Sequence, residues 1–256
     1  MEFTTWHDKK LNKTFVIRKR TEKKITKNAR YNNHPDADYT DLWIAGEMKQ
    51  YFKYISPQET DVWADFGSNI SLFGVLIFDK VKKIYGYEPH PDNIVVAKEN
   101  IKYHEMSNYQ LIEKAVVGDR SINDITLYLQ NDMACHSLAE RPRATVGQMI
   151  VPAVDINTVF EQHPDINKIK MDIEGAEYEV LLAYDKWDRF EEVLFEWHSR
   201  PNKDKPEEYA EGTKYKEVID HMRQYFPYIN YPEKLRFGAG MIHCSKIVPE
   251  EAKKLF

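Results

Sequence analysis

An acidic side chain and a glycine meet where an apolar run of the sequence turns into a helical pattern. The segment Asp65-Phe66-Gly67-Ser68-Asn69 ends that run. Glycine lets the backbone approach a ligand closely, and the start of the following helix offers unpaired N–H groups. A carboxylate just before the turn can accept hydrogen bonds from an ammonium or a ribose hydroxyl. We therefore expect a small-molecule cofactor to bind at Asp65, Gly67, Ser68 and Asn69.

The spacing of glycines in this loop argues against a dinucleotide. Pyrophosphate needs the close backbone approach that G-x-G-x-x-G provides, but no glycine follows Gly67 until Gly74. S-adenosylmethionine carries no phosphate, and its ammonium and sulfonium groups favour a nearby acid such as Asp65. The loop therefore favours S-adenosylmethionine over NAD and disfavours a nicotinamide oxidoreductase. A plain turn between a strand and a helix is the alternative explanation.

A second acid lies at the spacing expected of a ribose-binding group. Glu88 follows Gly67 by 21 residues and ends a predicted strand. In doubly wound nucleotide-binding folds, an acid at about this spacing accepts hydrogen bonds from the ribose hydroxyls. Pro89 and Pro91 end the strand and begin the next helix. We expect Glu88 and Pro89 to contact the cofactor, with a surface acid beside a proline turn as the alternative.

Two later segments bring more acids and a histidine to predicted strand ends. KMDIEGAE (170–177) places Asp172 at the end of a strand, where open α/β sheets bind ligands, with Glu174 close behind. LFEWH (194–198) places Glu196 and His198 on one face, because alternate residues of a strand point the same way. We expect all four in catalysis, and Asp172 in cofactor binding as well. Helix capping by the acids and a structural histidine are the alternatives.

The elements that would position these residues follow a regular alternation. From about residue 60, short apolar runs alternate with helical patterns, which is typical of a parallel sheet with crossover helices. The strands are expected at 61–66, 83–87, 109–117, 168–173 and 192–197, with two short ones near 228–231 and 241–245. The chain is therefore predicted to be an α/β protein.

In this order, the motifs resemble those of the FkbM family of S-adenosylmethionine-dependent methyltransferases. DFGSNIS resembles D-x-G-A-N-x-G, YEPHPDN resembles E-P-x-P-x-N, and VDINTVF resembles T-L-D-x-L. KIKMDIEGAEYEVL resembles the K-x-D-x-E-G-x-E block, which is the most specific, and LFEWH a strand ending in E-x-H. KAVVGD matches the segment after the third strand. The chain departs from the family pattern at Ser68 and Ser71, both small residues.

The resemblance covers about residues 60–200 and carries several expectations. It implies a Rossmann-like methyltransferase fold: a seven-stranded, mostly parallel sheet with an antiparallel last strand. It implies S-adenosylmethionine as cofactor, with Ala115 and Val116 beside it. It also implies O-methylation of a hydroxyl on a sugar, glycan or natural product. The long segment around His136 and Ser137 is expected near the acceptor or the adenine.

Methyl transfer to a hydroxyl requires that the acceptor oxygen be aligned and its proton removed. We expect Asp172 or His198 to act as the base, with Glu174 and Glu196 orienting the acceptor or the imidazole. A cation held by these acids, which would lower the pKa of the hydroxyl, is the second possibility. The sequence itself assigns no metal site.

The N-terminal part of the chain has the opposite charge to the rest. Residues 8–30 contain ten Lys and Arg against Asp8 and Glu22, a balance of +8 that leaves −13 for the remainder of a chain of net charge −5. We expect a basic arm and helix over 1–55 and a methyltransferase domain over 56–256. RNA methylation is an alternative function, but Phe15 is the only aromatic residue in 8–30, whereas RNA-binding sites pair basic residues with stacking rings. A non-catalytic cofactor-binding protein is a third possibility, although all the strand-end acids are present.

The cysteine content and the hydropathy of the chain indicate its cellular location. Cys135 and Cys244 are the only cysteines and show no zinc-ligand spacing. The N-terminus has no apolar signal region, and no run approaches eighteen apolar residues. We therefore expect a cytoplasmic protein with no membrane span. We expect its partner to be a hydroxyl-bearing acceptor rather than a nucleic acid, and the sequence does not indicate an oligomeric state.

Overall fold

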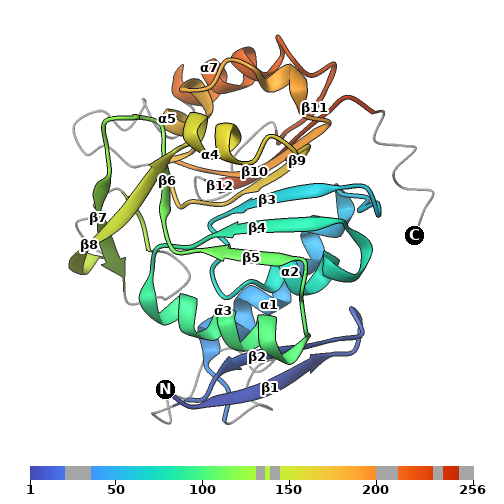
Figure 1. Ribbon diagram of the computed structural model, residues 1–256, viewed down its shortest axis with the longest axis vertical. Helices are drawn as coiled ribbons and strands as arrows, with labels where there is room; N and C mark the ends of the chain where they lie inside the picture. The colour runs from blue at the N-terminus through green and yellow to red at the C-terminus, as the bar shows by residue number, and fades with distance from the viewer. Residues whose placement is uncertain (21–35, 131–135, 139–144, 200–212, 233–238, 248–256) are drawn as a thin grey trace.

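The structure is a computed structural model that describes residues 1–20, 36–130, 136–138, 145–199, 213–232 and 239–247 (Figure 1). The strands of its main sheet are β3 (Val62–Phe66), β4 (Lys83–Tyr87), β5 (Tyr109–Ile112), β9 (Lys168–Met171), β10 (Glu192–His198), β11 (Tyr228–Asn230) and β12 (Ala239–Ser245). Their order is β11-β12-β10-β9-β3-β4-β5, and β12 runs antiparallel to both of its neighbours. The expected Rossmann-like methyltransferase fold, with seven strands and a reversed last strand, is confirmed.

Helices cover both faces of this sheet (Figure 1). They are α1 (Tyr39–Glu47), α2 (Leu72–Ile77), α3 (Pro91–Tyr103), α4 (Ile156–Gln162), α5 (Glu177–Leu182) and α7 (Thr213–Met222), with short 3-10 turns η1 (Met48–Lys53), η2 (Phe78–Lys80) and η3 (Trp187–Arg189). Helices α1, α2 and α3 pack on the face that carries Trp63, and α4, α5 and α7 on the face that carries Val62 and Ala64. Strand alternation therefore creates two cores from one sheet. None of the described helices is long and apolar enough to cross a membrane.

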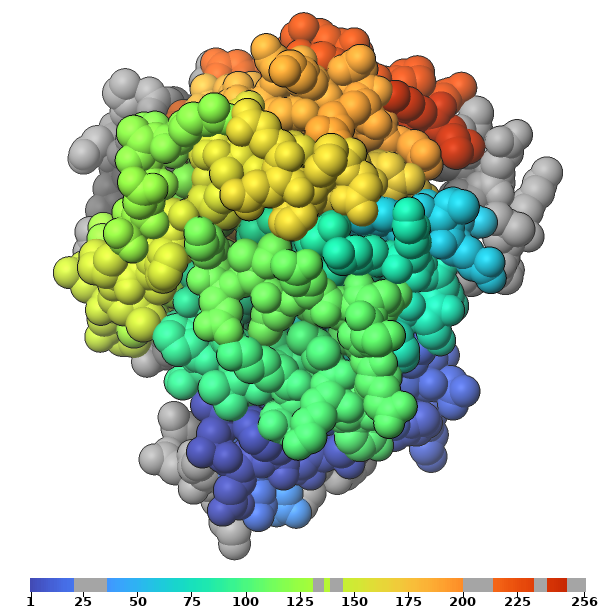
Figure 2. Space-filling view, in the orientation of Figure 1, coloured from blue at the N-terminus to red at the C-terminus, as the bar shows by residue number. Residues whose placement is uncertain are grey.

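The N-terminal segment begins with a hairpin of β1 (Phe3–Asp8) and β2 (Lys13–Arg18). Phe15 and Ile17 are fully buried in the core that contains α1 to α3. The Val16 N–H donates to Asn100 Oδ1 of α3 at 2.8 Å, and Figure 2 shows the blue hairpin lying against the green α3 region. The basic residues Lys23, Lys24, Lys27 and Arg30 lie outside the described part of the chain. A domain boundary at residue 55 stays a prediction.

A smaller sheet projects beside the carboxyl ends of the main strands. It contains β6 (Ala115–Val117), β7 (Asp124–Gln130) and β8 (Thr145–Asp155) in the order β6-β8-β7, with its own small core. The strand expected over 109–117 is therefore divided between two sheets. The Lys114 N–H donates to the Ile112 carbonyl at 2.9 Å, which turns the chain between β5 and β6.

Candidate active site

The register of the main sheet aligns the ends of four parallel strands. Across neighbouring strands, the paired residues are Phe66 with Tyr87, Phe66 with Met171, and Met171 with Phe195. The residues that come next are Gly67, Glu88, Asp172 and Glu196. Because parallel strands end at a common edge, motifs far apart in the sequence meet there.

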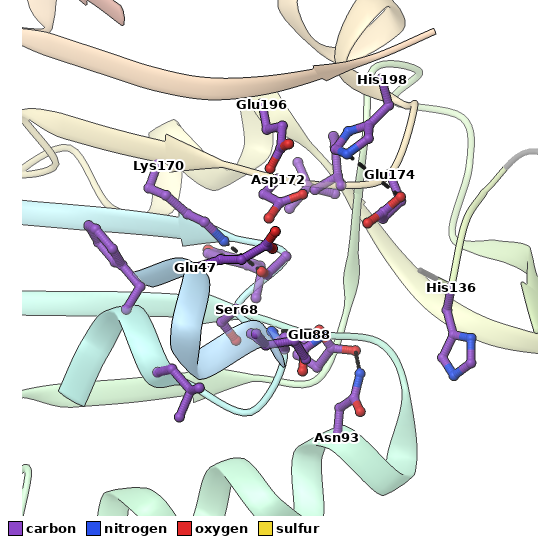
Figure 3. Close-up of a pocket in the computed structure, with 18 of the residues that line it drawn as sticks. Glu47, Ser68, Glu88, Asn93, His136, Lys170, Asp172, Glu174, Glu196 and His198 are labelled. Atoms are coloured by element: carbon purple, nitrogen blue, oxygen red, sulfur yellow. Dashed lines mark hydrogen bonds and ion pairs between the residues drawn. The ribbon is translucent and has the colours of Figure 1, made fainter. Parts of the chain in front are cut away.

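A cleft of about 870 Å³ opens over this edge (Figure 3). All four expected catalytic residues line it: Asp172, Glu174, Glu196 and His198. Of the expected cofactor residues, Gly67, Ser68, Asn69, Glu88, Pro89, Ala115, Val116 and Asp172 line it as well. Asp65 does not. The sequence motifs therefore come together in one cavity of the size that small-molecule sites have.

The loop between β3 and α2 is closed against both neighbouring strands. Gly67 has a φ of +71°, and a Cβ built on it would lie 1.8 Å from the carbonyl oxygen of Asp172. The N–H groups of Gly67 and Ser68 donate to the Tyr87 carbonyl at 3.0 and 2.9 Å. Only glycine fits at this position, because a side chain would clash with the backbone and strain its own.

Asp65 lies below the cleft and supports it. Its carboxylate is fully buried, with Oδ1 at 3.0 Å from Lys170 Nζ, which also donates to the Gly67 carbonyl at 2.8 Å. Burial alone would lower the pKa of Lys170, but the carboxylates of Asp65 and Asp172 raise it. Lys170 is therefore a cation that ties β3, the glycine loop and β9 together.

Glu88 faces the cleft from the end of β4. Its carboxylate accepts hydrogen bonds from the Asn69 N–H (2.9 Å), the His90 N–H (2.9 Å) and Asn93 Nδ2 (3.3 Å). Burial raises the pKa of Glu88 to about 6. A carboxylate has roughly four acceptor positions, and the protein fills three, so one remains for a ligand hydroxyl. The Arg18 guanidinium donates to Asn93 Oδ1 from the opposite side.

Small apolar residues and a histidine form the wall beyond Glu88. Ala115 and Val116 of β6 line the cleft together with Leu127 and His136. The Gln130 N–H donates to His136 Nδ1 at 3.1 Å, and burial lowers the pKa of this histidine to about 4. A neutral ring beside aliphatic side chains suits a flat, uncharged base such as adenine.

Four carboxylates gather at the other end of the cleft (Figure 3). They belong to Glu47 of α1, Asp172, Glu174, and Glu196 of β10. The Tyr51 O–H donates to Asp172 Oδ2 at 3.2 Å. Burial and the Asp172 carboxylate raise the pKa of Glu196 to about 8, although His198 opposes this shift. Glu196 has no hydrogen bond or salt bridge within the described part of the chain.

His198 lies between two carboxylates. Its Nδ1 is 3.1 Å from Glu177 Oε1, and its Nε2 is 3.7 Å from Glu174 Oε2. Burial alone would lower the pKa of His198, but Glu174 and Glu177 raise it well above its usual value. Ligand atoms of Asp172, Glu174 and His198 all lie within 4.8 Å of one another. The Ser137 O–H donates to the Glu174 carbonyl at 2.6 Å, so the segment around His136 and Ser137 does border the site.

Five residues of the site were not among the sequence-based candidates. They are Glu47, Tyr51, Asn93, Lys170 and Glu177. Three of these could have been identified from sequence motifs, because Lys170 and Glu177 belong to the K-x-D-x-E-G-x-E block and Asn93 belongs to the E-P-x-P-x-N segment. The other two come from α1 and η1, where the sequence carries no recognisable motif.

The sheet order, the reversed strand and the acid-lined cleft define a Rossmann-like methyltransferase. The sequence profile of the Methyltransferase FkbM domain matches residues 61–233, and the chain belongs to this family. Family membership confirms the resemblance noted from the motifs. It makes the chain a methyltransferase with S-adenosylmethionine as its cofactor.

Individual relatives are distant. An uncharacterized protein of Methanocaldococcus jannaschii, MJ1452, is 28% identical over 143 residues, covering 51% of this chain and 55% of that protein. The chain thus spans about half the length of this curated relative. Methyltransferase FkbM from Methylobacillus flagellatus KT is 12% identical, with a TM-score of 0.45 over 81% of this chain and 55% of that one. Precorrin-6y C5,15-methyltransferase from Geobacter metallireducens GS-15 is 10% identical, with a TM-score of 0.46 over 78% and 87%. These scores lie below 0.5, so the assignment rests on the family profile.

Proposed function

We propose that the chain transfers a methyl group from S-adenosylmethionine to a hydroxyl group of a sugar or glycan. The observation that carries this proposal is the position of Glu196. Its carboxylate lies beside Asp172, at the end of the strand next to β9, and is engaged by no donor among the described residues. A sugar hydroxyl is a poor nucleophile at neutral pH, and Glu196 in its ionised form is suited by this position to accept the hydroxyl proton.

The cofactor would lie across the aligned strand ends. Glu88 would accept from the ribose hydroxyls, Ala115 and Val116 would contact the adenine, and the loop at Gly67 would border the amino-acid part. When bound, S-adenosylmethionine supplies an electrophilic methyl group on a sulfonium. Asp65 supports this arrangement from beneath, since its carboxylate is paired with Lys170.

We assign proton removal to Glu196 rather than to His198. Both ring nitrogens of His198 already face carboxylates, Nδ1 that of Glu177 and Nε2 that of Glu174, so neither is left to take the proton of the acceptor hydroxyl. Asp172 is oriented by Tyr51 and would hold the acceptor in line with the methyl group. Glu174 would position the acceptor from the opposite side.

The lining of this end of the cleft favours a polyhydroxylated acceptor. Glu47 and Gln50 of the N-terminal segment line the cleft and offer hydrogen-bond partners, and Trp43 adds an aromatic residue to the lining. Three cations of the N-terminal hairpin are already paired with carboxylates: Lys13 with Asp79 at 3.0 Å, Arg18 with Asp41 at 2.6 Å and Lys19 with Glu2 at 2.9 Å, which leaves fewer of them to meet RNA phosphates. A small hydroxylated acceptor is therefore favoured over RNA.

Incubation of the full chain with methyl-labelled S-adenosylmethionine and three acceptor sets tests this function. The sets are oligosaccharides, small amines and total RNA. We expect a methyl ether on a saccharide, identified by mass spectrometry and NMR. Label that enters only RNA or amines would overturn the proposed acceptor class.

A further inference from the structure

We propose that Asp172, Glu174 and His198 bind a divalent cation of the Mn²⁺ or Mg²⁺ class at the acceptor end of the cleft. The role given to this cation rests on the methyltransferase function proposed above. The geometry fits, since one ligand atom from each residue lies within 4.8 Å of the other two. The side chains of His198 and Glu174 are 12% and 15% exposed, so the site is largely enclosed but open to the cleft.

The orientation of His198 is the first independent support. Glu177 is not one of the proposed ligands, and its side chain is 1% exposed. Its Oε1 atom accepts from the Ile173 N–H at 3.2 Å and the Gly175 N–H at 3.1 Å, and receives His198 Nδ1 at 3.1 Å. This fixes the ring with Nε2 directed toward Glu174. Metal-binding histidines almost always give their other N–H to a carboxylate or carbonyl in this way.

The distribution of charge is the second support. The carboxylates of Glu47, Asp172, Glu174 and Glu196 converge on one end of the cleft (Figure 3). Lys170 is attracted by Asp172 but lies to one side of this group, because its ammonium is held by Asp65 at 3.0 Å and by the Gly67 carbonyl at 2.8 Å. Figure 3 shows Lys170 on the opposite side of Asp172 from Glu174 and His198. Carboxylates brought together at this density favour a bound cation.

The ligand types indicate which cation. The two carboxylates suit Mn²⁺ or Mg²⁺, the imidazole favours the transition ion Mn²⁺ of these two, and no thiolate is present among the described residues that line the cleft. Three protein ligands would leave positions for water and for the acceptor hydroxyl.

A cation here would lower the pKa of the acceptor hydroxyl, and the chemistry then balances without another reactant. The hydroxyl oxygen forms a bond to the methyl carbon of the cofactor. The carbon–sulfur bond breaks and its electron pair goes to sulfur. The hydroxyl proton passes to Glu196, which lies on the same face of β10 as His198.

Binding of Mn²⁺ alone, without cofactor or acceptor, is the direct test. The full chain is freed of metal with a chelator, and free Mn²⁺ is followed by electron paramagnetic resonance during titration. We expect one Mn²⁺ per chain and competition by Mg²⁺. Glu174→Gln and His198→Ala should each weaken binding at least about tenfold, and Glu177→Gln, which acts through His198, about 10- to 100-fold. Glu179→Gln, on the exposed side of α5, is the matched control and should bind as the wild type does.

Thermal melts and binding of S-adenosylhomocysteine, measured on the same samples, show whether each variant is folded. Absence of Mn²⁺ binding to the wild type would overturn the proposed site. Binding of Mn²⁺ by Glu174→Gln and His198→Ala with the affinity of the wild type would overturn it as well. Methyl transfer to a saccharide that survives complete removal of metal would overturn the role of the cation while leaving the proposed function intact. Failure of the methyl transfer assay with Mn²⁺ bound would instead reject the proposed acceptor and leave the metal site standing.

Discussion

Gly67 and Asp172 approach so closely that a Cβ on Gly67 would lie 1.8 Å from the carbonyl oxygen of Asp172. One residue belongs to the loop expected to border the cofactor, and the other follows the strand expected to hold the acceptor. The contact therefore fixes the distance between the two halves of the site, which matters because methyl transfer requires the two reactants in line.

Gly67→Ala should disrupt this contact. The added methyl group must displace the loop from β9, and the left-handed backbone at φ +71° adds strain of about 1–3 kcal/mol. We expect a lower melting temperature and at least about tenfold weaker binding of S-adenosylhomocysteine, since 1.4 kcal/mol is a factor of ten. Gly147→Ala in β8 is the control, because its Cβ would meet only Leu129 at 3.7 Å. Equal melting temperatures and equal affinities for S-adenosylhomocysteine in Gly67→Ala and Gly147→Ala would refute a tight contact between Gly67 and Asp172.

The protonation of Glu88 should control cofactor affinity. Burial raises its pKa to about 6, and the ionised carboxylate is the better acceptor of ribose hydroxyls. Affinity for S-adenosylhomocysteine should thus be full above pH 7 and fall about tenfold at pH 5, where about a tenth of the groups remain ionised. The charge of Lys170 and the hydrogen bond from the His90 backbone N–H both favour the ionised form of Glu88 and so oppose the effect of burial on its pKa. Calorimetry between pH 5 and 7.5 measures this.

The matched variant for that measurement is Glu88→Gln, whose side chain does not titrate. Its affinity should be lower at neutral pH and nearly constant across the range. A wild-type profile that is equally flat would mean that Glu88 does not contact the ribose.

Arg18 should couple the N-terminal hairpin to the cofactor site. Its guanidinium pairs with the fully buried Asp41 at 2.6 Å and donates to Asn93, which in turn donates to Glu88. Arg18→Met leaves the buried Asp41 without its cation, which should cost about 3–5 kcal/mol of unfolding free energy, and it should also weaken cofactor binding. Chemical denaturation and calorimetry check both effects.

The neighbouring Lys19 provides the control for Arg18. Its pair with Glu2 is exposed, with side chains 45% and 76% accessible, and such pairs contribute little to stability. Lys19→Met should therefore behave as the wild type does. If Arg18→Met also leaves the unfolding free energy and cofactor binding unchanged, the hairpin is separable from the domain, in line with a boundary near residue 55.

Glu196→Gln should reduce turnover rather than binding. Loss of a group that accepts a proton in the transition state costs about 10²- to 10⁴-fold in kcat. Glu113→Gln is a surface control, since Glu113 pairs only with exposed Lys98 in the described part of the chain. Normal kcat in Glu196→Gln, measured with a saccharide acceptor, would place the proton acceptor elsewhere.

The sequence predicted the main sheet well and marked residues that line one cleft, because both depend on local signals. Strand alternation gave the seven strands, and Gly67 and Glu88 sit at strand ends that a short motif can mark. The helical pattern that follows the loop at Gly67 forms α2 and then the short turn η2 rather than one continuous helix. The strand over 109–117 was divided because Ala115 pairs with Ala153 of β8 rather than continuing β5, a long-range pairing that no local pattern encodes.

The acceptor side was harder to predict because its residues come from distant parts of the chain. Glu47 and Tyr51 reach the cleft from α1 and η1, and nothing in their local sequence indicates that these elements pack over the strand ends. Asp65 was expected to touch the ligand. The sequence could not reveal that Lys170, 105 positions later, ends beside it and pairs with its carboxylate.

Calorimetric titration of the full chain with S-adenosylhomocysteine and with NAD tests the central claim most directly. We predict that S-adenosylhomocysteine binds at one site per chain and that NAD gives no binding heat. Glu88→Ala should weaken binding roughly ten- to a hundred-fold, which corresponds to about 1.5–3 kcal/mol. Tight binding of NAD with none of S-adenosylhomocysteine would contradict the account.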